Sequence, residues 1–130
     1  MSMKNIASSN TKGSYSKVVL FQIEEPEKAP VTKQFKRRRI VLGRDEQCQF
    51  HLDDKMVSKQ HAEIVPMTRG LLLKDLDSLN GCYVNRKRVK RITLAKGDRI
   101  RIGKYTIVFL GVKKIRRNTE QEPFDTPRQD

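Results

Sequence analysis

The apolar residues of this chain come in short bursts, each bounded by Gly, Pro, Asp or Asn, and not in stripes with helical spacing. The bursts, in chain order, read KVVLFQI, RRRIVLG, CQFHL, HAEIVPM, GLLLKDL, RIRIG and YTIVFLG. Short β-branched runs at this spacing are typical of an all-β sandwich or barrel. Gly103-Lys104 between the last two bursts suits a tight hairpin, and Gly97-Asp98 marks a turn before RIRIG. We therefore predict an all-β sandwich without a helix longer than a turn or two.

The length of the chain, 130 residues, allows one domain with short tails but not two separate cores. Hydrophobic residues make up 36% of it and Trp is absent, so we expect a lean and largely aliphatic core. The first residues are rich in Ser, Asn and Lys, and the last stretch combines two prolines with mixed charge. We predict a disordered lead over residues 1–15, one domain over 16–112 and a flexible tail over 113–130.

Several classes of protein are disfavoured by what the sequence lacks. No run of about 18 apolar residues is present, so we expect no membrane span, and the first residues have no apolar core of the kind a secretory signal needs. Cys48 and Cys82 are too few for a disulfide framework or a four-ligand zinc site, so we expect no metal and a reducing compartment. His51 and His61 form no Ser/His/Asp set of known order, so we expect no catalytic residues, no cofactor and no enzyme.

Positive charge is concentrated in two segments. The chain has 28 Lys and Arg against 15 Asp and Glu, a formal net charge of +13. Residues 31–44 carry six basic and no acidic side chains, and residues 85–104 carry nine basic and one acidic. These two segments account for the whole net charge, which favours an anion-binding surface over a generally solubilising one.

Three polar clusters stand out between the predicted strands: GR at 43–44, SKQH at 58–61 and DLDSLNGCYVN at 75–85. Loops at one end of a sandwich come together in space, so we expect a guanidinium, a hydroxyl, an ammonium group and an amide to converge on one small anion. An arginine grips phosphate in a bidentate manner, and a serine hydroxyl and backbone N–H groups add short neutral hydrogen bonds. Asn80-Gly81 suits a turn with positive φ.

These clusters, in order and at these spacings, resemble the forkhead-associated (FHA) domain over about residues 17–112. The pattern is GR, then SxxH beginning fourteen residues after that arginine, then DxxSxNG and a closing LxxGDxIxIG. The resemblance implies a β-sandwich of two twisted, mostly antiparallel sheets with about eleven strands. It also implies apical loops that bind phosphothreonine peptides, without catalysis.

Carried over position by position, the resemblance implies distinct residue roles. It places Arg44 and Ser58 on the phosphate, and Lys59 on the phosphate or the peptide. Asn80 would hydrogen-bond the peptide backbone beside the phosphothreonine. Four further residues match positions that support the loops without touching ligand: Gly43, His61, Gly81 and Asn85.

The sequence departs from the family pattern at two positions beside the NG pair. Leu79 stands where many members have Thr or Ser, and Cys82 stands where Thr is common. Loss of a hydroxyl at 79 removes one possible phosphate hydrogen bond worth about 0.5–1.5 kcal/mol, so we expect affinity to fall about tenfold. Met56 matches a position that often reads the third residue after the phosphothreonine, which predicts an apolar residue there.

The interpretation that we favour is a module for phosphorylation-dependent protein–protein interaction in signalling, including DNA-damage or cell-cycle pathways. Its partners would be phosphothreonine-containing proteins, and basic charge with family habit favours the nucleus over the cytoplasm. Thr119 follows two arginines and Thr126 precedes a proline, so either could, when phosphorylated, dock into a second copy of the chain.

The alternative is a basic β-domain that binds nucleic acid, with the phosphopeptide pocket secondary or inactive. KRRR and NRKRVKR resemble nucleic-acid or nuclear-import patches in composition. Exposed aromatics are scarce, since Tyr83 and Tyr105 lie in strand-like runs, and stacking on bases needs exposed rings. We therefore expect the basic surface to steer an anionic phosphopeptide.

Overall fold

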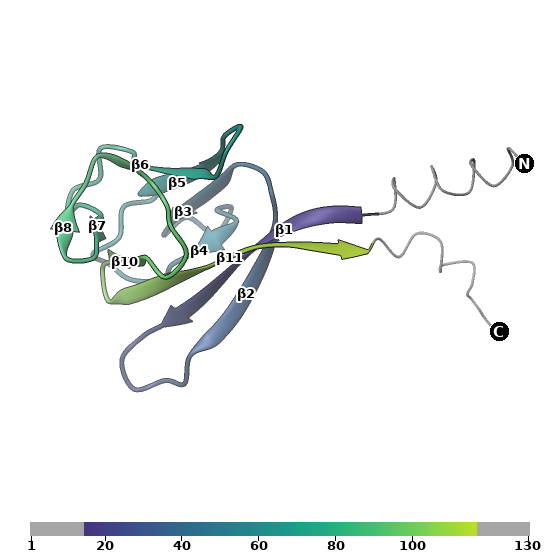
Figure 1. Cartoon of the computed structure of the whole chain (residues 1–130). Helices are drawn as coiled ribbons and strands as arrows, with labels where there is room; N and C mark the ends of the chain where they lie inside the picture. Colours follow the sequence, from purple (N-terminus) through teal and green to yellow (C-terminus); the bar gives the residue numbers. More distant parts are fainter. Residues whose placement is uncertain (1–14, 117–130) are drawn as a thin grey trace, which may run out of the picture.

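The computed structural model of the protein describes residues 15–116, which form eleven strands and no helix (Figure 1). The strands are β1 (Tyr15–Glu24), β2 (Val31–Lys36), β3 (Ile40–Gly43), β4 (Phe50–His51), β5 (Ala62–Pro66), β6 (Leu71–Asp75), β7 (Tyr83–Val84), β8 (Lys87–Arg88), β9 (Arg91–Thr93), β10 (Arg99–Ile102) and β11 (Tyr105–Arg116). Within this range, nothing is helical and apolar over a length that could cross a membrane.

The strands are divided between two sheets. A six-stranded sheet has the order β2-β1-β11-β10-β7-β8, and a five-stranded sheet has the order β4-β3-β5-β6-β9. The pairs are antiparallel except for β3 with β4, which is parallel. The predicted sandwich of two mostly antiparallel sheets with about eleven strands is confirmed.

The core lies between the sheets and includes more aromatic packing than expected. β10 alternates exposed arginines with fully buried isoleucines, and all four residues of β3 are buried. Four phenylalanine rings pack together, with the ring centroids of Phe21 and Phe50 at 5.9 Å. Each fully buried large apolar side chain contributes about 1.5–3 kcal/mol, so this cluster strengthens a core that is otherwise aliphatic.

Two hairpins shape the end of the sheet that carries β7 and β8. The predicted hairpin at Gly103-Lys104 is confirmed, because Ile102 pairs with Tyr105 across it and Gly103 has a φ of +59°. The β7–β8 hairpin was not predicted. Its central residues are Asn85 (φ +50°) and Arg86 (φ +75°), as in a type I′ turn.

β1 and β11 form the longest strand pair. They pair from Tyr15 opposite Arg116 to Glu24 opposite Thr106, with an irregularity beside Leu20. β11 therefore continues four residues beyond the predicted domain end at 112, because that segment is in register with the start of β1. The predicted lead over 1–15 likewise overlaps β1 at Tyr15. The rest of the lead, the part of the predicted tail beyond 116 and the predicted phosphorylation sites at Thr119 and Thr126 lie outside the described residues.

Candidate functional site

The loop after β3 and the loop before β5 are joined by backbone hydrogen bonds. Arg44 N donates to the Ser58 carbonyl (3.0 Å) and Asp45 N donates to the Lys59 carbonyl (3.2 Å). Gly43 is needed for this approach, because a Cβ at that position would lie 2.1 Å from the Lys59 carbonyl oxygen. The predicted supporting glycine therefore sets the contact that brings Arg44, Ser58 and Lys59 together.

The guanidinium of Arg44 is oriented by one hydrogen bond and otherwise exposed. Its Nε donates to the Val57 carbonyl (3.0 Å), which leaves both Nη groups with no bond inside residues 15–116. The loop is held from the other side by His51, whose Nε2 donates to the Arg44 carbonyl (3.1 Å). Neither Val57 nor His51 was predicted, since a backbone acceptor has no sequence signal and a lone exposed histidine has a weak one.

His61 is fully buried and joins the Ser58 loop to the turn at Gly81. Its Nδ1 accepts from Ser58 N (3.0 Å), and its Nε2 donates to the Gly81 carbonyl (2.8 Å). The first bond needs a bare nitrogen and the second needs a protonated one. The hydrogen bonds therefore define a neutral imidazole with its hydrogen on Nε2.

Ser58 also contacts the loop after β6. Its Oγ accepts a hydrogen bond from Leu79 N (3.1 Å), so its own proton stays available for an anion. The Leu79 side chain is 83% exposed. A hydroxyl at position 79 would therefore face solvent beside Ser58, and leucine offers none.

The Asn80-Gly81 turn is built by a local network. Asp75 accepts from Ser78 N (3.1 Å) and from Ser78 Oγ (2.5 Å), and Gly81 N donates to Ser78 Oγ (3.0 Å). Gly81 has a φ of +88°, which confirms the predicted turn with positive φ. Asn80 Nδ2 then donates to the Met56 carbonyl (2.8 Å), so this turn is tied to the loop before β5.

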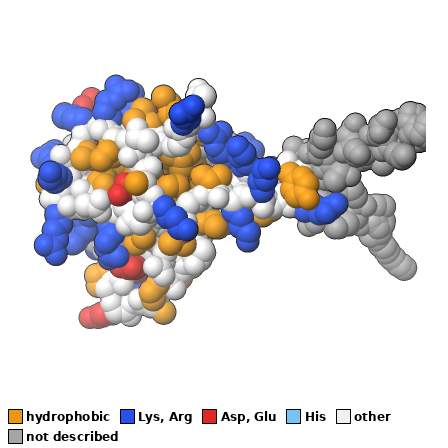
Figure 2. Space-filling model, in the orientation of Figure 1, with side chains coloured by type: hydrophobic (Ala, Val, Ile, Leu, Met, Phe, Trp, Pro, Cys, Tyr) orange, Lys and Arg blue, Asp and Glu red, His pale blue; other side chains and the backbone are white. Residues whose placement is uncertain are grey.

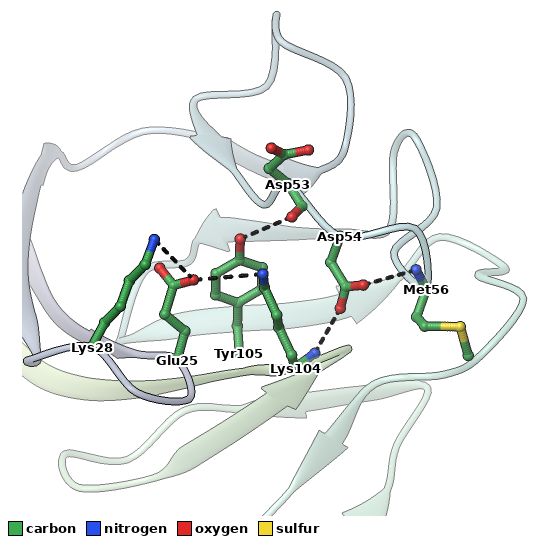
Figure 3. Close-up of polar contacts among 7 residues, drawn as sticks. All are labelled: Glu25, Lys28, Asp53, Asp54, Met56, Lys104 and Tyr105. Atoms are coloured by element: carbon green, nitrogen blue, oxygen red, sulfur yellow. Dashed lines mark hydrogen bonds and ion pairs between the residues drawn. The ribbon is translucent and has the colours of Figure 1, made fainter.

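Asp54 fixes the loop that carries Met56 against the β10–β11 hairpin (Figure 3). Its carboxylate accepts from Met56 N (3.1 Å) and from Lys104 N (2.8 Å). Partial burial raises the pKa of Asp54, but the two N–H donors and the charge of Lys104 outweigh it, so the pKa lies below its usual value. Asp54 was not predicted, although an Asp two residues before a turn amide is a known turn-forming signal.

Hydrogen bonds therefore link the segments that carry all six predicted ligand contacts, which are Arg44, Met56, Ser58, Lys59, Leu79 and Asn80. Asn85 lies apart from them. Its side chain accepts from Arg99 N (3.0 Å) and donates to Asp98 (3.0 Å), and so holds the β7–β8 hairpin to β10.

The electrostatics of these loops favour an anion. Neither Arg44 nor Lys59 takes part in an ion pair within residues 15–116, and both side chains are exposed. Over the same residues, no cluster of His, Cys, Asp and Glu could hold a metal ion. A groove next to the loops is lined by Met56, Asn80, Gly81, Tyr83, Arg101 and Gly103.

Comparison with known proteins identifies the family. A family model for the FHA domain matches residues 40–103. The chain is 44% identical over 68 residues to the glycogen accumulation regulator GarA of Mycobacterium tuberculosis, covering 52% of this chain and 42% of GarA. It is 40% identical over 74 residues to the oxoglutarate dehydrogenase inhibitor of Corynebacterium diphtheriae, covering 57% and 52%. The chain thus spans about half the length of these curated relatives.

Solved structures agree. One FHA domain, solved in work on phosphothreonine-dependent FHA interactions, aligns with a TM-score of 0.63 and 34% identity, covering 71% of this chain and 95% of that one. The FHA domain of FhaA, in complex with the intracellular domain of another protein, aligns with a TM-score of 0.62 and 36% identity, covering 73% and 99%. The chain belongs to the FHA family, and the predicted resemblance is confirmed.

Proposed function

We propose that this protein is a regulatory interaction module that binds phosphothreonine-containing segments of partner proteins through Arg44, Ser58, Lys59 and Asn80. The observation that carries the proposal is the arrangement of Arg44, Ser58 and Lys59. Two guanidinium nitrogens, a hydroxyl proton and an ammonium group project from two loops that are bonded together, with no acidic partner in the described residues.

The chemistry of these groups makes binding depend on the modification. A phosphothreonine carries about −1.5 to −2 charges and three acceptor oxygens. Each hydrogen bond to a charged group is worth about 1.5–3 kcal/mol, so two such bonds from Arg44 give a preference on the order of 100-fold or more over unmodified threonine. Asn80 uses one N–H on Met56, and its Oδ1 and second N–H remain for a peptide backbone.

The exposed side chains of Leu79 and Met56 affect the affinity and the residue preference of this site. Without a hydroxyl at 79 the phosphate has one donor fewer, so Leu79→Thr is expected to tighten binding about tenfold, measured by peptide titration. Unchanged affinity would show that position 79 does not reach the phosphate. Met56 is 55% exposed beside the groove, which suits an apolar residue three positions after the phosphothreonine.

A regulatory role without catalysis by this chain is supported by its relatives, which are named a regulator and a dehydrogenase inhibitor. Both names describe proteins that act on the activity of others. A phosphopeptide-binding domain can do this by docking on a modified partner, which requires no reacting group of its own.

The test is fluorescence titration with a degenerate phosphothreonine peptide library and with its unphosphorylated counterpart. Arg44→Ala is expected to lose about 100-fold in affinity. Arg69→Ala is the matched control, because Arg69 is also an exposed arginine but lies in the β5–β6 turn, where it has no ion pair with any of residues 15–116. Equal binding of both libraries, or equal losses in both variants, would contradict the proposal.

A further inference from the structure

A basic hollow lies on the outer face of the six-stranded sheet, next to the candidate phosphate site. It has a volume of about 540 Å³ and is lined by Tyr83, Asn85, Arg86, Arg99, Arg101 and Thr106. Tyr83, Arg101 and Thr106 are in register across β7, β10 and β11. Because the neighbouring Ile100 and Ile102 are fully buried, this row faces away from the core.

The hollow carries positive charge that the described residues do not neutralise. Arg86 has no ion pair or side-chain hydrogen bond within residues 15–116, and Arg101 bonds only the Gly103 carbonyl (3.1 Å). Arg99 pairs with Glu24 (3.0 Å), and Asp98 accepts a hydrogen bond from the lining residue Asn85 (3.0 Å), so the lining charge that the described residues leave unpaired is on Arg86 and Arg101. Figure 2 shows Lys and Arg side chains gathered at the end of the molecule that carries β7 and β8.

The backbone at Arg86 is unusual for an arginine. Its φ of +75° is a conformation that glycine or asparagine usually supplies in a type I′ turn. For other residues this conformation costs about 1–2 kcal/mol. The turn therefore keeps a cation at the rim of the hollow at the expense of stability, which points to a function for that side chain.

The hollow is adjacent to the groove beside Met56 and Asn80, because Tyr83 and Arg101 line both. A peptide that leaves the Arg44–Ser58 loops past Met56 thus meets Arg101 first and Arg86 beyond it. If Met56 reads the third residue after the phosphothreonine, the hollow receives the residues that follow.

We propose that this hollow binds acidic side chains, Asp or Glu, located downstream of the third residue after the phosphothreonine in the same peptide. This rests on the proposed function. Guanidinium groups bind carboxylates in a bidentate manner, and the two uncompensated arginines match an acidic segment in charge. The target class is then narrower than a phosphothreonine alone: a phosphothreonine followed, past an apolar position, by acidic residues.

The test uses synthetic phosphothreonine peptides with one shared core, titrated by fluorescence anisotropy near physiological salt. One has Asp and Glu downstream, one has them upstream and one has Ser and Gly at both ends. The downstream-acidic peptide is expected to bind about tenfold tighter than the neutral one. The variant Arg86→Gln changes a residue that lines the hollow but not the groove beside Met56, so it should lose most of that advantage and keep its affinity for the neutral peptide.

Arg91→Gln is the matched control, since Arg91 is an exposed arginine on β9 of the other sheet, and it should retain the full advantage. An advantage that survives undiminished in Arg86→Gln, or that appears only for the upstream segment, would overturn the inference. The inference would also fail if affinity rose only when phosphoserine replaced Asp and Glu. It would fail too if a single-stranded oligonucleotide displaced the bound peptide while acidic residues gave no advantage.

The neutral phosphopeptide separates the two proposals. If it binds and acidic residues add nothing, the hollow has no part in recognition while the phosphate site stands. If no phosphopeptide binds the folded protein, the proposed function fails and this inference fails with it.

Discussion

Replacing His61 with alanine removes the buried imidazole that joins the Ser58 loop to the Gly81 turn. Two hydrogen bonds are lost, from Ser58 N (3.0 Å) and to the Gly81 carbonyl (2.8 Å). The Gly81 carbonyl is buried, so leaving it without a partner costs about 1–3 kcal/mol. Water can reach the partly buried Ser58 amide, so the loss of the hydrogen bond from this amide costs less. With the volume left by the ring, we expect a total destabilisation of about 2–5 kcal/mol.

The assay is urea denaturation, followed by far-ultraviolet circular dichroism. For a small domain the free energy of unfolding falls by about 1–3 kcal/mol per molar urea, so the midpoint should drop by roughly 2 M. His51→Ala is the matched control. It removes one hydrogen bond from an exposed ring and should cost no more than about 1.5 kcal/mol. Equal losses of stability in both variants would refute the reasoning that the two bonds of His61 tie the loops together.

Three further results are expected. Gly43→Ala should destabilise the fold by more than about 1 kcal/mol and weaken phosphopeptide binding, because the alanine Cβ would lie 2.1 Å from the Lys59 carbonyl oxygen. Thermal melts and peptide titration measure the two effects, and wild-type values in both would contradict the prediction. Burial, with help from Asp75, raises the pKa of the Cys82 thiol to about 12, so at pH 8 iodoacetamide should label the half-buried Cys48 first, as read by mass spectrometry. The pKa of Asp54 is lowered in the folded state, so its contribution to stability is present above about pH 4 and is lost as the pH falls through the folded pKa. Asp54→Asn should therefore be less stable at pH 7 and should lose less stability on acidification, and an unchanged acid limb would contradict this.

Strands with a strong apolar pattern were predictable from the sequence, and strands without such a pattern were not. β10 reads RIRI, so its alternation gives both the strand and its buried face. β2 reads VTKQFK and is largely exposed, because it lies at a sheet edge and packs mainly through Phe35. β8 is two basic residues long, and only pairing across the turn at Asn85 makes it a strand. Edge and hairpin strands depend on their neighbours, which a local pattern does not record.

The candidate site divides in the same way. Arg44, Ser58 and Asn80 were predictable because their side chains carry the chemistry and sit in a recognisable order. The carbonyls of Val57 and Met56, which orient Arg44 and Asn80, are backbone atoms that any residue supplies. The charge of residues 85–104 predicted an anion-binding surface, and the alternation of β10 puts Arg99 and Arg101 on one face. That Arg86 joins them at one hollow follows from the β7–β8 turn and the register of β7 and β10, which the sequence does not record.

The pairing of Tyr15 with Arg116 has a mechanical consequence. The two ends of the described fold leave from one point, on the side opposite to β7 and β8 (Figure 1). A force that pulls these ends apart acts across the β1–β11 ladder and not along it. The hydrogen bonds of the ladder then break one after another, as a zipper opens, instead of sharing the load. Under tension the domain should begin to unfold at low force at the Tyr15–Arg116 pair. The loops around Arg44 should be among the last parts to unfold.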